Sequence, residues 1–569
     1  MTISSKYRAL AAAVAATAAV GLVWGLCESG AEDRTALVDD VPELWFSRES
    51  GFYDEEFDLE IVSNGGTVYY TTDGSFPTKS STRYTGPIHI ADATANENVY
   101  SLRTDLSTAF AKEFTVPDYK VDKCTVIRAA IYYPSGGRSQ AKTASYFVGF
   151  GEKGGYENMN VVSIVADPAN LFDYDKGIYV TGRPYDDYLE QIARGELEED
   201  QRWAIWPANY RKRGIRWERP ADIQFFDTNG DLLLSQRCGI RIRGQWSRAD
   251  LPKSLNLYAR EIYDGSSVFR YPFFNALSDD AADGPEYFPS RMTLTNGGND
   301  YSRCKDWLIH TLCRDMDFAT MSTVPCVMFL DGEYWGVYWL TEKYDEPYVN
   351  YRYGIDRDNI AMIKSRKLEN GTEEDFLEYS ETKELLSSMD MTDEANYRKA
   401  CELLDMDNTV DYYAAMLYIA RTKDWPDYNY MIFRSRYPDT DSFSDCRYRW
   451  MLYDVNSPGI TTGYANLDTI QAAMERDTVF ANLMNNDGFR NRLLDRIVEL
   501  DSTVFSKENV SRRLDEFHAL MDIPMKYHCD RFYGGAYKER YVDLVDSIEA
   551  FFELRRTAIH EMTERYRSR

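Results

Sequence analysis

The chain changes its hydrophobic period once along its length, and this change constrains the fold more than any single motif. Up to about residue 300 the apolar residues lie in short β-rich runs, divided by turn signals such as Asn64-Gly65 and Asn229-Gly230. From Trp307 onward they recur at helical spacing. The clearest amphipathic segments are 489–501, 508–521 and 541–566. Strands followed by helices predict an α+β fold with a helical C-terminal half.

The charge of the chain excludes whole classes of partner. Its 569 residues are enough for roughly two to four domains of ordinary size. The 65 Lys and Arg residues stand against 92 Asp and Glu, which gives a formal net charge of −27. A field of that sign repels phosphate backbones and anionic lipid headgroups. We therefore expect no nucleic-acid partner and no docking on a membrane surface.

Residues 1–31 have the pattern of a targeting segment. Lys6 and Arg8 precede an uncharged run from Ala9 to Cys27, which as a helix would span about 28 Å, close to the thickness of a bilayer core. Small residues follow the run, so a cleaved signal peptide and an uncleaved anchor are both open, and a buried N-terminal helix is a third alternative. We expect an extracytoplasmic protein, secreted or held by one N-terminal transmembrane segment, that touches the membrane only through this segment.

Strong catalytic and metal-binding motifs are absent from the sequence. The nine cysteines contain no Cys-x-x-Cys pair, which argues against zinc ribbons and thioredoxin-like redox sites. The eight cysteines after Cys27 could pair in an oxidising compartment or remain buried thiols. There is no P-loop, nucleophile elbow or His-Glu-x-x-His helix, and the five histidines disfavour histidine-based acid–base chemistry.

Residues 45–150 have the pattern of an all-β module. Short β-rich runs, among them 58–62 and 125–130, are separated by Gly-containing turns, which predicts a small sandwich. The stretch from Gly66 to Thr78, followed by Tyr84-Thr85-Gly86-Pro87-Ile88, resembles the immunoglobulin-like module at the C-terminus of chitobiases and hexosaminidases. In that family the module is usually an accessory. The resemblance implies a surface protein, with cell-wall glycan as a candidate partner.

Two polar segments in the second half of the chain offer oxygen ligands. Pro426 is expected to end the preceding helix, which leaves Asp424 and Asn429 on a turn. Asp454 ends an aromatic-rich strand that begins near Arg449. Two carboxylates and an amide suit a Mg²⁺ ion that holds substrate phosphates, and one carboxylate could accept a hydroxyl proton. Ordinary turn and helix-end aspartates are the alternative.

A strand–loop–strand segment concentrates cations in this otherwise acidic chain. Its basic residues are Arg241, Arg243, Arg248 and Lys253. Gly244 lies where the backbone could approach an anion, and Lys253 starts the return strand, where an ammonium could reach phosphates. A solvated basic hairpin is the alternative.

A third segment is a predicted hairpin whose second strand ends in a carboxylate. Asp331-Gly332 is a type I′ turn signal between two aromatic-rich strands. Glu342 follows the second strand in an aromatic setting, where a carboxylate needs a cationic partner, and Lys253 is one candidate. An ordinary edge glutamate paired with Lys343 is the alternative.

Together these segments resemble the CotH kinase family, named for the spore-coat protein H of endospore formers. The resemblance spans about residues 160–500 and keeps the order of the family's motifs. The matching stretches are Arg241 to Gly244, Pro252-Lys253-Ser254, Asn296 to Asp300, Asp331 to Lys343, Asp424 to Asn429 and Trp450 to Asp454. The resemblance implies an atypical protein-kinase-like domain over 158–569, with a helical C-terminal extension, that transfers the γ-phosphate of ATP to hydroxyls of a protein substrate.

The resemblance also implies roles for single residues. Lys253 and Arg243 would bind ATP through its phosphates, and Glu342 would hold Lys253. Asp424 would orient or deprotonate the acceptor hydroxyl, and Asn429 would bind Mg²⁺.

Asp454 would be the second Mg²⁺ ligand, and two departures from the family pattern bear on it. Family members commonly have a second Asp two positions later, whereas this chain has Asn456, which removes a charge from the metal shell. The phosphate-binding lysine is often doubled, and here Ser254 follows it. Two hypotheses therefore stand: an ATP- and Mg²⁺-dependent protein kinase, and a non-catalytic surface protein whose kinase-like region is a scaffold.

Overall fold

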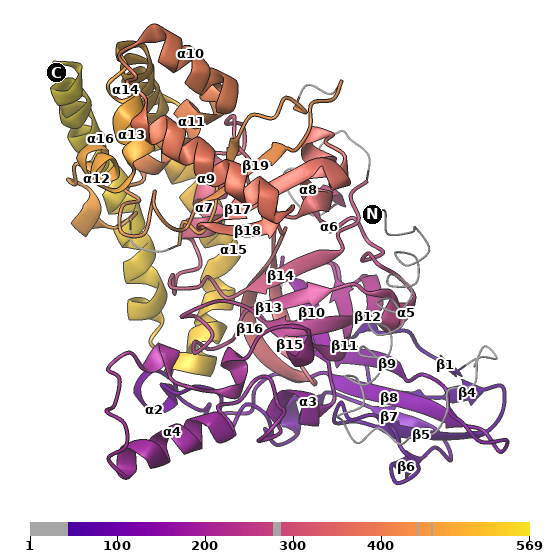
Figure 1. The fold of residues 1–569 in the computed structure, drawn as a ribbon. Helices are drawn as coiled ribbons and strands as arrows, with labels where there is room; N and C mark the ends of the chain where they lie inside the picture. Colours follow the sequence, from indigo (N-terminus) through magenta and orange to yellow (C-terminus); the bar gives the residue numbers. More distant parts are fainter. Residues whose placement is uncertain (1–43, 157, 277–285, 441–442, 457–458, 569) are drawn as a thin grey trace, which may run out of the picture.

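The computed structural model describes residues 44–568 apart from 157, 277–285, 441–442 and 457–458 (Figure 1). The targeting segment expected at 1–31, with Cys27, lies outside these residues. Within the described part of the chain no helix is both long and apolar enough to cross a bilayer. Sheets occupy the N-terminal part and helices dominate the C-terminal part, which confirms the predicted α+β class.

The N-terminal module consists of three small sheets around one apolar core. Its strands are β1 (Leu44–Phe46), β2 (Gly51–Tyr53), β3 (Phe57–Leu59), β4 (Ile61–Ser63), β5 (Thr67–Thr71), β6 (Thr82–Arg83), β7 (Ile88–Ile90), β8 (Thr125–Tyr132) and β9 (Lys142–Val148). The main sheet has the order β2-β9-β8-β5-β6, while β1 pairs with β4 and β3 pairs with β7. Phe46, Leu59 and Ile131, one from each sheet, lie in the same buried cluster. The run expected at 58–62 is broken at Glu60, so its halves join different sheets.

The centre of the molecule is a closed seven-stranded barrel in the order β10-β11-β12-β13-β14-β16-β15 (Figure 1). Its strands are β10 (Asn160–Val165), β11 (Arg219–Phe226), β12 (Leu232–Ile242), β13 (Leu255–Tyr258), β14 (Arg291–Thr295), β15 (Thr323–Leu330) and β16 (Glu333–Thr341). Every residue of β10 and β16 is buried. Asp331 and Gly332 have φ values of 47° and 91°, which confirms the predicted hairpin turn between β15 and β16.

One rim of this barrel collects the segments that the sequence singled out. In the barrel register Ile242 pairs with Leu255 and Leu255 pairs with Leu294, while Thr341 pairs with both Thr293 and Thr323. The ends of β12, β14 and β16 and the starts of β13 and β15 therefore lie at the same rim. The residues just beyond these ends are Arg243, Lys253, Asn296, Ser322 and Glu342.

A second sheet and the helical region follow the barrel in the chain. The sheet has the order β18-β17-β19-β20 and consists of β17 (Ile360–Lys364), β18 (Lys367–Asn370), β19 (Met431–Ser435) and β20 (Arg449–Met451). The α-helices from residue 305 onward are α7 (Lys305–Leu312), which lies between β14 and β15, α8 (Glu346–Tyr353), α9 (Glu373–Ser388), α10 (Glu394–Leu403), α11 (Met406–Tyr418), α12 (Thr469–Arg476), α13 (Thr478–Leu483), α14 (Asp487–Ser502), α15 (Lys507–Tyr533) and α16 (Asp543–Arg567). The three amphipathic segments predicted near the C-terminus correspond to α14, α15 and α16. Helix α15 reaches from the helical region to the barrel, where it packs on β16 and α7 (Figure 1).

The described α-helices before α7 lie in the connections of the N-terminal half. They are α2 (Phe110–Glu113), α3 (Pro168–Phe172), α4 (Arg183–Ala193), α5 (Glu261–Asp264) and α6 (Phe273–Ala276). None of them carries a residue of the predicted site.

Candidate active site

The loop that follows β20 meets α7 at a partly buried carboxylate, Asp306, in the first turn of that helix. One oxygen of Asp306 accepts a hydrogen bond from the backbone N–H of Val455 (3.0 Å), and the other accepts one from the side-chain amide of Asn456 (2.8 Å). Asp454, the predicted Mg²⁺ ligand, immediately precedes these two donors. Asp306 thus fixes the backbone of the loop on which Asp454 stands.

The electrostatics of this contact point to a cation. Burial, and after it the nearby Asp454 carboxylate, raise the pKa of Asp306 to about 6, against the opposing charge of Arg243. Arg243 therefore lies within electrostatic range of Asp306, as its position at the end of β12 predicts. Two neighbouring carboxylates with one arginine beside them leave an excess of negative charge that a divalent ion can offset.

A glycine-containing loop closes one side of this region. It follows β14, and its Gly298 has a φ of 63°; a Cβ placed there would lie 2.9 Å from the side-chain nitrogen of Asn456. The loop is held by Ser254, whose hydroxyl donates to the Asn296 side-chain oxygen (2.7 Å) and accepts from the Asn296 N–H (2.9 Å). The position where the family often has a second lysine therefore carries a loop-fixing serine in this chain.

The predicted loop residues Asp424 and Asn429 are brought together. The Asn429 side-chain amide donates to one carboxylate oxygen of Asp424 at 2.8 Å, and the other oxygen lies 2.7 Å from the guanidinium of Arg421. The preceding helix, however, does not continue to Pro426. Helix α11 ends at Tyr418, because Ala420 adopts a left-handed φ of 57° and the Arg421 N–H closes the helix end on the Met416 carbonyl.

The register of the second sheet places Asn429 and Asp454 at the same end of two neighbouring strands. Met431 pairs with Met451, so the chain enters β19 from Asn429 and leaves β20 toward Asp454 at the same end. Lys364, the last residue of β17, pairs with Met431 and lies at that end too. Its ammonium is 4.5 Å from the ring centroid of Tyr453, the neighbour of Asp454.

Lys253 lies on the rim, but its ammonium faces away from the predicted partner. The side chain is fully buried, and Nζ donates to the Arg248 carbonyl (2.5 Å) and lies 3.7 Å from the ring centroid of Tyr210. Burial lowers the pKa of Lys253 well below its usual value. Glu342 instead accepts a hydrogen bond from the Ser322 N–H (2.7 Å) and lies 3.5 Å from Arg352.

The Lys253–Glu342 ion pair implied by the resemblance is therefore not formed between these two described residues. The reason is the loop after β12, which turns its carbonyl groups toward Lys253, while the loop before β15 supplies the donor for Glu342. Both side chains hold the rim together in this conformation.

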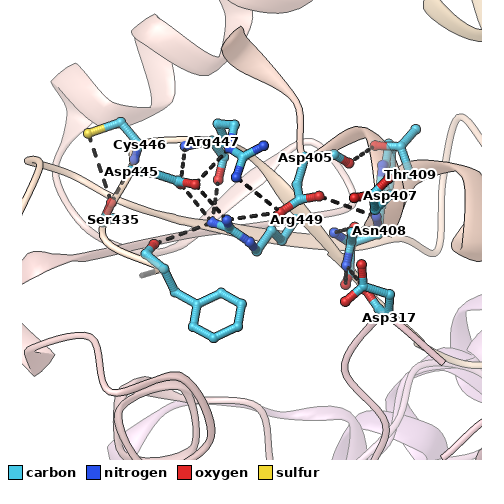
Figure 2. A network of polar contacts seen from close by, with 12 residues as sticks. Asp317, Asp405, Asp407, Asn408, Thr409, Ser435, Asp445, Cys446, Arg447 and Arg449 are labelled. Atoms are coloured by element: carbon cyan, nitrogen blue, oxygen red, sulfur yellow. Dashed lines mark hydrogen bonds and ion pairs between the residues drawn. The ribbon is translucent and has the colours of Figure 1, made fainter. Parts of the chain in front are cut away.

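A polar network anchors the strand that leads to Asp454 (Figure 2). The Asn408 side chain accepts from the Trp450 N–H (2.7 Å) and donates to the carbonyl groups of Asp317 (2.6 Å) and Trp450 (3.3 Å). Arg449, almost completely buried, forms ion pairs with Asp405 (2.9 Å) and Asp445 (2.8 Å). The network fixes β20 to the start of α11 and to the segment before β15.

An acidic group lies at the surface end of the same network. Carboxylate oxygens of Asp317, Asp405 and Asp407 all lie within 4.8 Å of one another. Asp405 forms an ion pair with Arg449, and its side chain accepts a hydrogen bond from the Asn408 N–H at the start of α11, so its oxygens have partners. These two contacts of Asp405 anchor the strand without a bound ligand.

Cys446 is the cysteine that Figure 2 shows in the polar network, where its N–H donates to the Ser435 hydroxyl (2.9 Å). The eight cysteines in the described part of the chain are free thiols, most of them buried. Between the two alternatives that the sequence left open, the structure shows unpaired side chains.

Sequence reasoning missed three residues of the site: Asp306, Lys364 and Arg421. Asp306 follows the Asn-Gly-Gly-Asn-Asp run at the start of a helix, and that run was a usable signal. Lys364 ends an ordinary β-strand, and nothing around it in the sequence marks it. Arg421 lay inside the expected helix, so its turn toward Asp424 was hidden.

Comparison with known families agrees with this geometry. Residues 48–102 match the chitobiase/beta-hexosaminidase C-terminal domain, which confirms that resemblance. No curated protein matches the chain. Residues 240–559, more than half of the chain, match the family described as CotH kinase protein, and this range contains all the predicted site residues. The chain is therefore a member of the CotH kinase protein family.

Proposed function

We propose that the protein is an ATP- and Mg²⁺-dependent atypical protein kinase that phosphorylates hydroxyl groups of a protein substrate. Family membership suggests an atypical kinase and implies the use of ATP. In the proposed reaction the acceptor oxygen attacks the γ-phosphorus, the bond from that phosphorus to the β,γ-bridging oxygen breaks, and ADP leaves. The hydroxyl proton passes to Asp424 or to solvent.

The observation that carries this proposal is the pair of hydrogen bonds between Asp306 and the loop of Asp454, within electrostatic range of Arg243. Phosphoryl transfer needs a cation-rich cradle for phosphates beside oxygen ligands, held in fixed positions. Arg243 and Lys364 supply positive charge at the point where the barrel rim meets the sheet edge. Asp454 and Asn429 lie at that edge on backbone with left-handed φ values of 56° and 50°.

The donor set fits Mg²⁺, which prefers carboxylate and amide oxygens. Asp454 and Asn429 would hold the ion, and Asp306 fixes the loop of Asp454 beside them. When bound, the ion would neutralise charge on the phosphates. The residues of the chain orient the substrates: Arg243 binds phosphate oxygens, and Asp424 orients the acceptor hydroxyl. Lys253 is proposed as a phosphate ligand only if its ammonium leaves the Arg248 carbonyl.

We further propose that the protein acts outside the cytoplasm, secreted or anchored by its N-terminal segment. The chitobiase-like module supports this placement, because it offers an accessory domain of a kind found on surface proteins, with cell-wall glycan as a candidate ligand. The net charge of −27 supports the absence of nucleic-acid partners.

A thermal-shift titration with ATP and MgCl₂ tests nucleotide binding. A ligand that binds only the folded state stabilises it by about 2.7 kcal/mol at a hundred times its Kd. We expect ATP with Mg²⁺ to raise the unfolding temperature of the wild type and of the control Asp439→Ala, which removes an exposed carboxylate. Asp454→Ala should abolish the shift. No shift in the wild type would refute the proposal.

A non-catalytic surface protein is the second candidate function. The observation that favours it is the burial of the Lys253 ammonium, which lies against the ring of Tyr210 and donates to the Arg248 carbonyl rather than binding the Asp454 loop. Under this alternative the module binds polysaccharide and the kinase-like domain is a scaffold. A polysaccharide pull-down that needs no ATP and survives Asp454→Ala, together with a flat ATP titration, would support it.

A further inference from the structure

We infer that Arg421 is a positioning residue for Asp424, kept in the core at a cost to the stability of the fold. The inference rests on the proposed function, in which Asp424 orients the acceptor hydroxyl. It draws on the way in which the Arg421 guanidinium is buried without the hydrogen bonds that a buried arginine normally makes.

Arg421 is buried almost completely, with 1% of its side chain exposed. Its Nη2 lies 2.7 Å from Asp424 Oδ1, which gives an ion pair. Yet Nε, Nη1 and Nη2 all lack a hydrogen-bond partner of good geometry among the described residues, and so does Asp424 Oδ1. A guanidinium stays charged and carries five N–H donors, so leaving them unsatisfied in the interior is expensive.

The local backbone commits Arg421 to this position. The left-handed turn at Ala420 ends α11, and the Arg421 N–H bonds to the Met416 carbonyl (3.1 Å). The side chain then projects beneath the loop that carries Asp424. One carboxylate oxygen of Asp424 pairs with Arg421, and the other accepts a hydrogen bond from the Asn429 amide. These two contacts fix the orientation of the carboxylate.

Arg555 shows what a purely structural arginine looks like in the same region. It is equally buried and binds the end of the same helix. All three of its nitrogens donate hydrogen bonds of 2.8–3.0 Å, to Tyr418 O, Leu417 O, Ala465 O, Leu467 O and Thr469 Oγ1. Arg555 thus satisfies its donors on surrounding carbonyl and hydroxyl groups, whereas among the described residues the Arg421 side chain has a single charged partner, Asp424.

This contrast separates the two roles. Replacing both members of a buried ion pair by apolar side chains often costs no stability, whereas removing one member is costly when the other is left buried. Asp424 is 29% exposed and keeps the hydrogen bond from the Asn429 amide, so it can be hydrated when Arg421 is replaced. An arginine that satisfies five carbonyl and hydroxyl acceptors cannot be replaced without loss, because its removal leaves those acceptors unpaired. Arg421 has Asp424 as its only ion-pair partner among the described residues, so its burial is best explained by that proposed hydroxyl-orienting carboxylate.

The test compares Arg421→Met and Arg421→Lys with Arg555→Met in the full chain. Thermal unfolding midpoints and the kcat and KM for ATP are measured for phosphate transfer to casein as a generic acceptor protein. We expect Arg421→Met to unfold at the wild-type temperature or above, to lose on the order of 100-fold in kcat, and to keep its KM for ATP. Arg421→Lys should recover part of kcat, and Arg555→Met should unfold at a clearly lower temperature.

Two results overturn the inference: Arg421→Met as destabilised as Arg555→Met, or Arg421→Met with wild-type kcat. If the wild type transfers no phosphate under any condition, the proposed function is refuted instead. The unfolding comparison then decides the inference alone, since a destabilised Arg421→Met contradicts a side chain kept at a cost to the fold and an unchanged or stabilised one supports it.

Discussion

The side-chain amide of Asn456 donates a 2.8 Å hydrogen bond to Asp306, and this contact joins α7 to the loop of Asp454. An amide suits this position, because its hydrogen bond favours the charged form of Asp306, whose pKa burial and Asp454 raise to about 6. The residue that departs from the family pattern is thus matched by a carboxylate on another element.

Exchanging Asn456 for Asp tests this complementarity. Asn456→Asp sets a second carboxylate against Asp306, so we expect a loss of about 1–3 kcal/mol in the free energy of unfolding at pH 8. The loss should be smaller at pH 5, where Asp306 is protonated. Urea unfolding at both pH values measures it.

The double variant Asp306→Asn/Asn456→Asp should recover most of that stability, because it reverses the pair. Asn96→Asp, a change at an exposed position, should stay within about 0.5 kcal/mol of the wild type. A single Asn456→Asp variant as stable as the wild type at pH 8 would show that the two side chains are not coupled.

The strand before Asp454 should depend on Asn408, which holds Trp450 from both sides (Figure 2). Asn408→Ala leaves buried backbone groups of Trp450 and Asp317 unpaired, so we expect a loss of about 2–4 kcal/mol in unfolding free energy. The matched control is its neighbour Asp407, whose side chain is 69% exposed and pairs only at the surface. Asp407→Ala should cost at most about 1 kcal/mol, and equal losses in the two variants would contradict the anchoring role.

The rim cations should differ in their effect on ATP. Arg243 is close enough to Asp306 to act on its charge, whereas the ammonium of Lys253 is enclosed under Tyr210. Arg243→Met should raise the KM for ATP about tenfold or more, as expected for the loss of a charge-assisted hydrogen bond. Lys253→Met should change it less, but it should lower the free energy of unfolding, because it leaves the Arg248 carbonyl and the buried Asp250 without their cation. A larger loss of ATP affinity in Lys253→Met would return the phosphate role to Lys253.

Acid should destabilise the fold through His310. Burial lowers the pKa of His310 to about 3, and its Nδ1 accepts the Met321 N–H (3.0 Å). Between about pH 6.5 and pH 3 the unfolded chain binds a proton that the folded chain refuses, so stability falls as the pH falls through this window. His310→Asn keeps an acceptor but does not titrate, and should make the fall shallower by up to about 1.4 kcal/mol per pH unit.

Guanidinium unfolding at pH 7, 5.5 and 4 measures this slope. The same change at the surface residue His560 should leave it nearly as in the wild type. Parallel slopes for His310→Asn and the wild type would contradict the prediction.

Much of the fold could be predicted because its signals are local. The run at 125–130 lies in β8, and the Asp331-Gly332 hairpin and the C-terminal amphipathic helices also form as predicted. The closure of seven strands into a barrel could not be predicted, because β10 pairs with β15 across more than 150 residues of chain. Pairing at that separation leaves no periodic trace in the sequence.

In the site, too, local contacts could be predicted from the sequence and long-range contacts could not. Asp424 and Asn429 are five residues apart, and their contact follows from one turn. Asp306 and Asn456 come together only through the packing of α7 against the second sheet, so sequence spacing could not reveal them. The ion pair expected between Lys253 and Glu342 fails because Lys253 binds a carbonyl of its own loop and Glu342 binds the segment before β15 and Arg352 of α8.

Transfer of ³²P from γ-labelled ATP to an acceptor protein, with MgCl₂ present, tests the central claim most directly. The wild type and Asp439→Ala should incorporate label into the acceptor, and Asp454→Ala should lose at least about 100-fold while keeping its fold by circular dichroism. Incorporation by Asp454→Ala at the wild-type rate, or none by the wild type, would contradict the account.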